Sequence, residues 1–246
     1  DEVPSIAIIP FDNKGKEEDV FYAYGISADL ISDCSSAGLI RVASKRDIEK
    51  LDYTKLDNTE LSEKLFVRYI ATGELWRMDD MFQLSVELYD TKDKKVVWSD
   101  RWQEKWDNLP TIKGSLSDGL LKALDTKPKV EQTVATTNPE AYEYLLKAKY
   151  RWQKRVDVED IQITRGLLNK AISLDDDLIL AKVSLGSTYT YEGKYEIAME
   201  ILNSTLIQAE AVGQKYELAK VLGNIGHIYE IKRENNQALE CFTRSL

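Results

Sequence analysis

The sequence predicts two folded parts of different class, an α/β (α+β) mixed-sheet domain followed by an all-α helical solenoid. Short apolar runs alternate with helical periodicity up to about residue 126, which predicts strands and helices in one domain. The stretch 126–138 has four threonines and little apolar content, and every later segment shows helical periodicity only. We therefore expect domains at 1–126 and 139–246, joined by an extended linker at 127–138.

The first part is predicted to order its elements as β-α-β-α-α-β-β-β-α. Its clearest signal is residues 82–89, where apolar and polar side chains alternate strictly between two polar turns. Such alternation indicates a strand with one buried face, and the turns predict an antiparallel meander around it. The expected elements are strands at 5–9 and 39–43, helices at 17–38, 44–51 and 59–66, the meander over 68–106, and a helix capped by Asn108.

The second part repeats itself at an offset of 40 residues, where Leu185-Gly186-x-x-Tyr189 returns as Ile225-Gly226-x-x-Tyr229. The pattern resembles the tetratricopeptide repeat, a helical hairpin whose ordinary period is 34 residues. Gly186 and Gly226 would let the two helices of a hairpin approach closely. A degenerate first copy at 139–177 brings the number to about three, and we expect the array to continue beyond residue 246.

Composition excludes several classes of function. A net charge of −9, with 17 basic against 25 acidic residues in 1–126, argues against binding to nucleic acid. Two cysteines and one histidine exclude a disulfide framework and histidine-rich metal sites. No apolar run reaches the roughly 20 residues of a membrane helix, and no phosphate-binding or nucleophile motif occurs. We expect no catalytic residue, no cofactor and no metal ligand, so the chain is not predicted to be an enzyme.

Several separated segments carry a family resemblance. The opening 9–13 (IPFDN) and 21–31 (FYAYGISADLI), then 68–73 (RYIATG) and 88–90 (LYD), resemble TolB-like amino-terminal domains. Followed by tetratricopeptide repeats, this order resembles the C-terminal region of bacterial class III adenylate or guanylate cyclases and related signalling proteins. The resemblance implies a regulatory module whose output domain lies elsewhere. It leaves a cytoplasmic or a periplasmic location open, depending on whether a membrane helix precedes Asp1.

Two hypotheses about function remain from these observations. The first is a non-catalytic sensor or scaffold that binds a protein or peptide on the concave face of the repeats. The alternative is a small-ligand receptor, in which the TolB-like domain binds a metabolite or an envelope component. The oligomeric state is open in both. The candidate partner-binding residues are Leu180, Val183, Ser187, Thr190, Lys220, His227 and Glu230.

Other conspicuous residues have simpler structural interpretations. Cys34 and Cys241 are expected in apolar cores rather than as nucleophiles. The run Asp175–Asp177 is expected to end a helix, since it lacks the spacing of a calcium loop. A basic stripe is predicted to be a solvated helix face or a docking surface, and it consists of Lys147, Arg151, Lys154 and Arg155. A tryptophan series is predicted to pack in a core or interface, and it consists of Trp98, Trp102 and Trp106.

Overall fold

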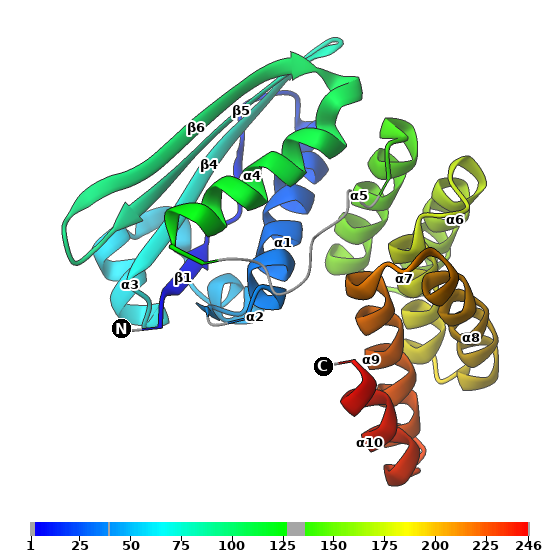
Figure 1. Cartoon of the computed structure of the whole chain (residues 1–246). Helices are drawn as coiled ribbons and strands as arrows, with labels where there is room; N and C mark the ends of the chain where they lie inside the picture. The colour runs from blue at the N-terminus through cyan, green and yellow to red at the C-terminus, as the bar shows by residue number, and fades with distance from the viewer. Residues whose placement is uncertain (1–2, 39, 127–135, 246) are drawn as a thin grey trace. The chain divides into compact units, whose positions relative to one another are not determined.

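The chain is described by a computed structural model that covers residues 3–38, 40–126 and 136–245. It divides into two compact units, Asp1–Gln132 and Thr133–Leu246. The first unit contains a mixed sheet with helices packed on it, and the described residues of the second unit form helices and short connections only (Figure 1). The predicted fold class is confirmed.

The first unit follows the predicted order of elements except for one additional two-residue strand before the first helix, and it has short 3-10 turns between elements. Asp57 caps the third helix through a capping box with Glu60, and Ser44 caps the second. Asn108 stands at the N-cap of the unit's last helix as predicted but makes no side-chain capping bond, and its amide nitrogen donates to Glu104 Oε2 at 3.1 Å. The elements are β1 (Ser5–Ile8), β2 (Asp12–Asn13), α1 (Val20–Ser36), β3 (Arg41–Val42), α2 (Lys45–Glu49), η2 (Tyr53–Lys55), α3 (Asn58–Leu65), β4 (Tyr69–Met78), β5 (Met81–Asp90), β6 (Lys95–Lys105) and α4 (Leu109–Ala123).

The strands described form one six-stranded sheet in the order β3-β1-β4-β5-β6, with β2 also paired to β4. β1 runs parallel to β3 and β4, whereas β4, β5 and β6 form the antiparallel meander that the alternation at 82–89 predicted. Phe82, Leu84, Val86 and Leu88 are buried on one face of β5. Their period of two fixes the register, because a slip by one residue would expose all of them.

The two faces of the sheet are covered unequally. α1 and α4 lie on the same face (Figure 1), where the Trp98 ring packs against Gly119 of α4. On the other face, α2 and α3 bury a second core over β1 and the start of β4, which includes Ile48, Leu61 and Ile70. The later part of β4 and its neighbours carry half-buried or exposed side chains on that face.

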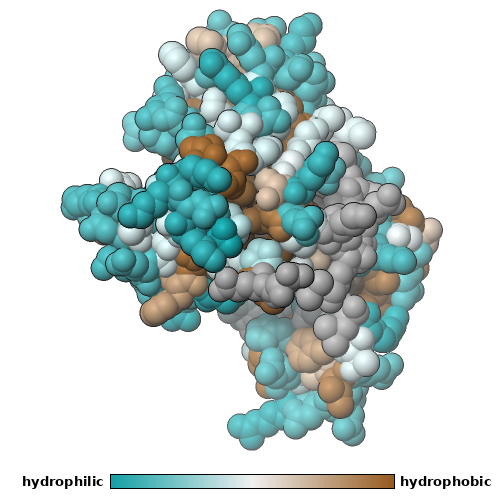
Figure 2. Space-filling model, turned by 60° about the vertical axis from the view of Figure 1, so that its left-hand side comes forward, coloured by the Kyte–Doolittle hydropathy of each residue, from teal (hydrophilic) through white to brown (hydrophobic). Residues whose placement is uncertain are grey.

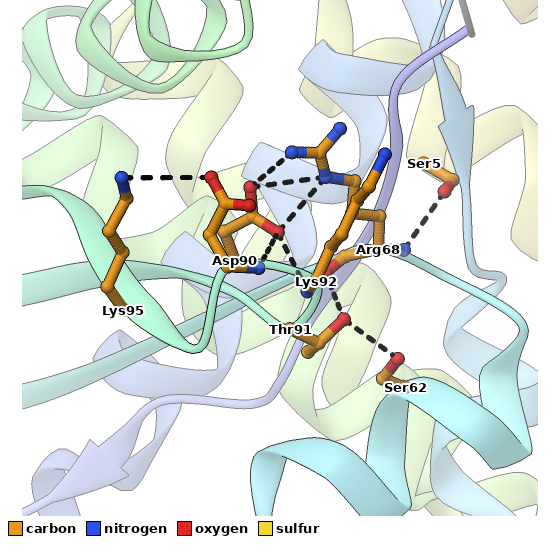
Figure 3. A network of polar contacts seen from close by, with 8 residues as sticks. Ser5, Ser62, Arg68, Asp90, Thr91, Lys92 and Lys95 are labelled. Carbon is orange, nitrogen blue, oxygen red and sulfur yellow. Dashed lines mark hydrogen bonds and ion pairs between the residues drawn. The ribbon is translucent and has the colours of Figure 1, made fainter.

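A polar network joins the ends of β4 and β5 (Figure 3). The Arg68 guanidinium donates from Nε and Nη2 to the buried carboxylate of Asp90, at 2.6–3.1 Å. The amides of Lys92 and Asp93 donate to the same carboxylate, and the Thr91 hydroxyl donates to the Arg68 carbonyl at 2.7 Å. Burial opposes ionisation of Asp90, but these donors outweigh it and lower its pKa. The network therefore ties the start of β4 to the end of β5.

The second unit contains three helical hairpins in its described residues. Each successive pair of helices packs as a hairpin, α5 with α6, α7 with α8, and α9 with α10. Thr136 is buried and Asn138 caps α5 through a bond to the Ala141 amide, so the end of the predicted linker belongs to this unit; 127–135 lie outside the described residues. The helices are α5 (Pro139–Lys154), α6 (Val158–Leu174), α7 (Ile179–Tyr191), α8 (Tyr195–Val212), α9 (Lys215–Ile231) and α10 (Asn235–Arg244).

Close approach of the helices depends on the two repeated glycines. A Cβ at Gly186 would lie 2.9 Å from Cγ of Leu202 in α8, and one at Gly226 would lie 2.7 Å from the Phe242 ring in α10. Both distances are too short for ordinary carbon contacts, whose optimum is about 3.5–4.0 Å. The glycine positions in the 40-residue repeat therefore mark where each hairpin closes.

We expect Gly186→Ala to lower the free energy of unfolding of the repeat unit by about 1–2 kcal/mol, because the added methyl group overpacks the contact with Leu202. Gly166→Ala in α6 is the matched control. A Cβ there meets nothing within 4 Å, so the change should stabilise the helix by about 0.5–1 kcal/mol. Urea unfolding followed by helical circular dichroism measures both. Equal effects of the two changes would contradict the close approach.

We expect Asp90→Asn to destabilise the first unit by about 1–3 kcal/mol near neutral pH, since the Arg68 guanidinium loses a charged acceptor. The folded pKa of Asp90 is lowered, so its contribution is present above the unfolded value of about 3.9 and is lost as pH falls through the folded pKa. The difference between wild type and variant should therefore shrink in acid. Asp93→Asn, at an exposed pair with Lys95, should change stability by less than about 0.5 kcal/mol. A difference that stays constant down to low pH would refute the role of Asp90.

Candidate functional site

The first helices of the three described hairpins share one side of the second unit. The Trp152 ring of α5 meets the edge of Tyr191 of α7, with ring centres 5.2 Å apart. The Ser187 hydroxyl of α7 donates to Oδ1 of Asn224 in α9 at 2.8 Å. We call this surface, formed by α5, α7 and α9, the first-helix face. It is where the sequence placed its candidate partner-binding residues.

The structure brings most of those residues onto the first-helix face. His227 and Glu230 lie one turn apart on α9 with side chains about 60% exposed, and His227 Nδ1 lies 3.3 Å from Glu230 Oε2. Ser187 and Thr190 of α7 are half-buried. Leu180 and Lys220 are also half-buried, and the Lys220 ammonium lies 5.2 Å from the centre of the Tyr216 ring.

Val183 does not belong with the others. It is 7% exposed and packs in the core cluster with Ile179, Leu202 and Val221. A partner could reach it only by opening the contact between α7 and its neighbours. The prediction of Val183 as an accessible binding residue is wrong, because the side of α7 on which it lies is covered by packing. A charged residue there would disrupt the core rather than test binding.

A small hollow of about 150 Å³ opens between α5 and α7, with α6 beneath it. Its lining mixes apolar atoms with a few hydroxyl groups. A cavity of about this volume holds a benzene-sized group, so the hollow fits one apolar side chain. We call it the anchor pocket. It is lined by Ala148, Lys149, Trp152, Thr164, Leu168, Ser184, Ser187 and Thr188.

Sequence reasoning found neither the anchor pocket nor Asn224. Asn224 lies one helical turn after Lys220, so the spacing along α9 could have placed it on the same face. The anchor pocket carries no such signal, since α5, α6 and α7 contribute to it together and the first repeat departs from the glycine pattern. Only Ser187 belongs to both the predicted set and the pocket.

Three residues of the basic stripe at α5 contact other residues of their own unit. Arg151 forms an ion pair with Asp160 at 2.6 Å, and Lys147 pairs with Glu143. The Arg155 guanidinium stacks 3.9 Å from the centre of the Trp152 ring and 4.4 Å from that of Tyr191. The sequence left open a solvated face or a docking surface. The Arg155 stacking holds the end of α5 against α7 and the Trp152 ring beside the anchor pocket, whereas the Arg151 pair joins α5 to α6.

A buried arginine joins the first two hairpins. Arg165 of α6 is 5% exposed, and it donates to the Thr188 hydroxyl at 2.9 Å, the Thr188 carbonyl at 3.0 Å and Glu192 Oε2 at 2.5 Å. Its guanidinium also lies 3.8 Å from the centre of the Tyr189 ring. Bonds from Arg165 and Lys194 lower the pKa of Glu192. Arg165 thereby sets the position of α6 against the end of α7, next to the anchor pocket.

The remaining conspicuous residues have packing roles. Burial raises the pKa of the Cys34 thiol to about 12, and burial also raises that of Cys241, so neither is poised as a thiolate. The ring centres of Trp98 and Trp102 lie 6.5 Å apart, and the Trp106 indole nitrogen donates to the Tyr22 hydroxyl at 2.8 Å. Asp175 ends α6, as predicted. Within the described segments, no helix is both long and apolar enough to cross a bilayer.

Two comparisons of sequence found similar proteins. Residues 2–118 match the family described as HilA/YgeH-like transcriptional regulator, second domain. Putative adenylate cyclase 3 of Rhizobium meliloti (strain 1021) is 24% identical over 189 residues, which cover 74% of this chain and 32% of that protein. The chain thus spans about a third of the length of that relative.

Solved structures show weaker likenesses. TolB from Acinetobacter baumannii covers 50% of this chain and 29% of its own, with 20% identity and a TM-score of 0.39. MamA covers 56% of this chain and 75% of its own, with 17% identity and a TM-score of 0.36. At these values neither likeness carries an argument about function.

We expect Glu192→Gln to destabilise the repeat unit by about 2–3 kcal/mol, because it removes the carboxylate that faces the buried Arg165 guanidinium. Glu196→Gln, at an exposed position in the first turn of α8, is the control and should change stability by less than about 0.5 kcal/mol. Thermal unfolding of the full chain measures both. Equal melting temperatures for Glu192→Gln and wild type would show that Arg165 does not depend on this partner.

Proposed function

We propose that the chain is a non-catalytic regulatory module whose repeat unit binds a peptide segment of a protein partner on the first-helix face. The observation that carries the proposal is the anchor pocket between α5 and α7, continuous with a polar strip on the same face. That strip consists of Ser187 and Asn224, joined by their hydrogen bond, and the exposed His227 and Glu230. Helix side chains presented along such stacks are how solenoids ordinarily bind extended or helical peptides.

The chemistry of the first-helix face suits a peptide of modest polarity. The anchor pocket would take one apolar side chain, held between the Trp152 ring and Leu168. The polar strip offers both donors and acceptors to a peptide backbone. Figure 2 shows another side of the molecule, on which hydrophilic residues dominate and hydrophobic ones form small groups. One enclosed anchor with a polar surround is the usual composition of a binding surface that is not permanently covered.

The regulatory part of the proposal is supported by the two sequence relatives. One is the second domain of a transcriptional regulator family, and the other is a putative adenylate cyclase of which this chain covers 32%. We infer that the chain serves as the regulatory part of a longer bacterial signalling protein, such as a class III nucleotide cyclase. Formation of cyclic nucleotide by the purified chain alone would refute its non-catalytic role.

A peptide selected from a random display library against the full chain provides the probe for binding. We expect Ser184→Leu to lower the affinity for that peptide by about tenfold or more, because the larger side chain fills the anchor pocket. A tenfold loss corresponds to about 1.4 kcal/mol of binding free energy. Ser184 is half-buried and its hydroxyl bonds only to the Leu180 carbonyl of its own helix among the contacts described, so the helix should tolerate the change. Titration calorimetry measures the affinity.

Glu200→Ala on α8 is the control for this experiment, since it is exposed on a second helix of a hairpin. It should leave the affinity unchanged. Helical circular dichroism of both variants confirms that they fold. If folded Ser184→Leu binds every selected peptide as tightly as wild type does, the anchor pocket is not the binding site and the proposal fails.

A further inference from the structure

A second and larger hollow lies in the first unit, at the step where the helical cover of one sheet face ends. Its volume is about 590 Å³, within the range of about 300–1,000 Å³ that ligand pockets occupy. β4 and β5 form its floor, the turn after β1 forms one wall, and Tyr53 and Thr54 of η2 form another. We call it the sheet hollow. It is separate from the repeat unit and independent of the function proposed above.

The floor of the sheet hollow is set by the register of the meander. Thr72 lies directly opposite Glu87, and Glu74 lies directly opposite Ser85. Opposite residues of antiparallel strands share a face, so these four side chains stand together on the face that α2 and α3 leave open. Two carboxylates and two hydroxyls thus point from the floor into the same space.

A third carboxylate stands at the rim. Asp12 of β2 pairs in register with Glu74 of β4, which places two negative charges on adjacent strands. The Lys14 ammonium bridges them, 2.5 Å from the Asp12 carboxylate and 3.4 Å from that of Glu74. The two carboxylates raise the pKa of Lys14. The rim therefore already accepts one ammonium group, supplied by the chain itself.

The walls provide what a bare carboxylate cluster lacks, which is apolar surface. Ile9 and Pro10 line one side, and the half-buried Tyr53 ring lines the other. Among the described residues that line the hollow, none is a lysine or an arginine. Aromatic rings attract cations through their negative faces, and an aliphatic stem can lie along them while its charged end meets a carboxylate.

We propose that the sheet hollow binds an organic cation, a guanidinium or a primary ammonium on an aliphatic stem. The stem packs between Tyr53 and Pro10, and the charged group meets Glu87 and Glu74 on the floor. Lys14 competes for Glu74 at the rim. This inference gives a chemical class to the ligand-receptor hypothesis, and it needs no oxidant, metal or covalent step.

The test uses the full chain labelled with ¹⁵N and titrated with agmatine, which carries a guanidinium at one end of an aliphatic stem and a primary ammonium at the other. We expect amide shifts at Thr72, Ser85 and Glu87, with a Kd of about 1 mM or tighter. Butylurea, of similar shape but neutral, should not bind. A glycine-flanked arginine peptide forms a second arm; tighter binding of the peptide would identify the natural cation as a protein side chain, and tighter binding of agmatine would identify a free amine.

Two variants, one that removes a negative charge and one that removes a positive charge, separate this proposal from unspecific charge attraction. Glu87→Gln should lower the affinity for agmatine by at least about threefold. Lys14→Met should raise that affinity by about the same factor, because a competing cation is removed. The controls are Glu63→Gln and Lys16→Met, which change the same net charges away from the hollow and should have no effect. Equal binding of butylurea, equal effects of Glu63→Gln and Glu87→Gln, or shifts outside the hollow would overturn the proposal.

Discussion

The close approach of paired helices at Gly186 and Gly226 is the constraint on which the repeat unit depends. Where Leu202 and Phe242 fill the space that a Cβ would need, the hairpin closes at one spacing only. That spacing decides which side of α7 and α9 turns toward the partner helix and which side is left for α5, α7 and α9 to share. The first-helix face is thus a consequence of hairpin packing.

The joint between the first two hairpins relies on polar contacts rather than on a glycine. Arg165 is buried and is held by Thr188 and Glu192. Removing one partner of such a group leaves a buried charge without compensation, which costs more than the pair itself contributes. The anchor pocket lies next to this joint and shares Thr188 with it, so the proposed peptide would lie against the residues that set the angle between the two hairpins.

Local patterns in the sequence predicted the elements well, whereas the sites needed the tertiary structure. The alternation at 82–89 and the repeated glycines identified the meander and the hairpins, because each reports a period that the backbone imposes. Val183 was misplaced since periodicity alone cannot tell which side of a helix its neighbours cover. The anchor pocket and the sheet hollow each combine residues distant in the chain. Asp12, Tyr53 and Glu87 give no shared signal until the strand register and the packing of η2 bring them together.

The central claim is that α5, α7 and α9 present the binding surface of the repeat unit. Hydrogen–deuterium exchange of the full chain, with and without a peptide selected by display, tests this claim directly. The account predicts slower exchange in α5 and α7 around the anchor pocket and in α9 around Asn224, with α8 and α10 unchanged. Slower exchange confined to α6, α8 and α10, or to the first unit alone, would contradict it.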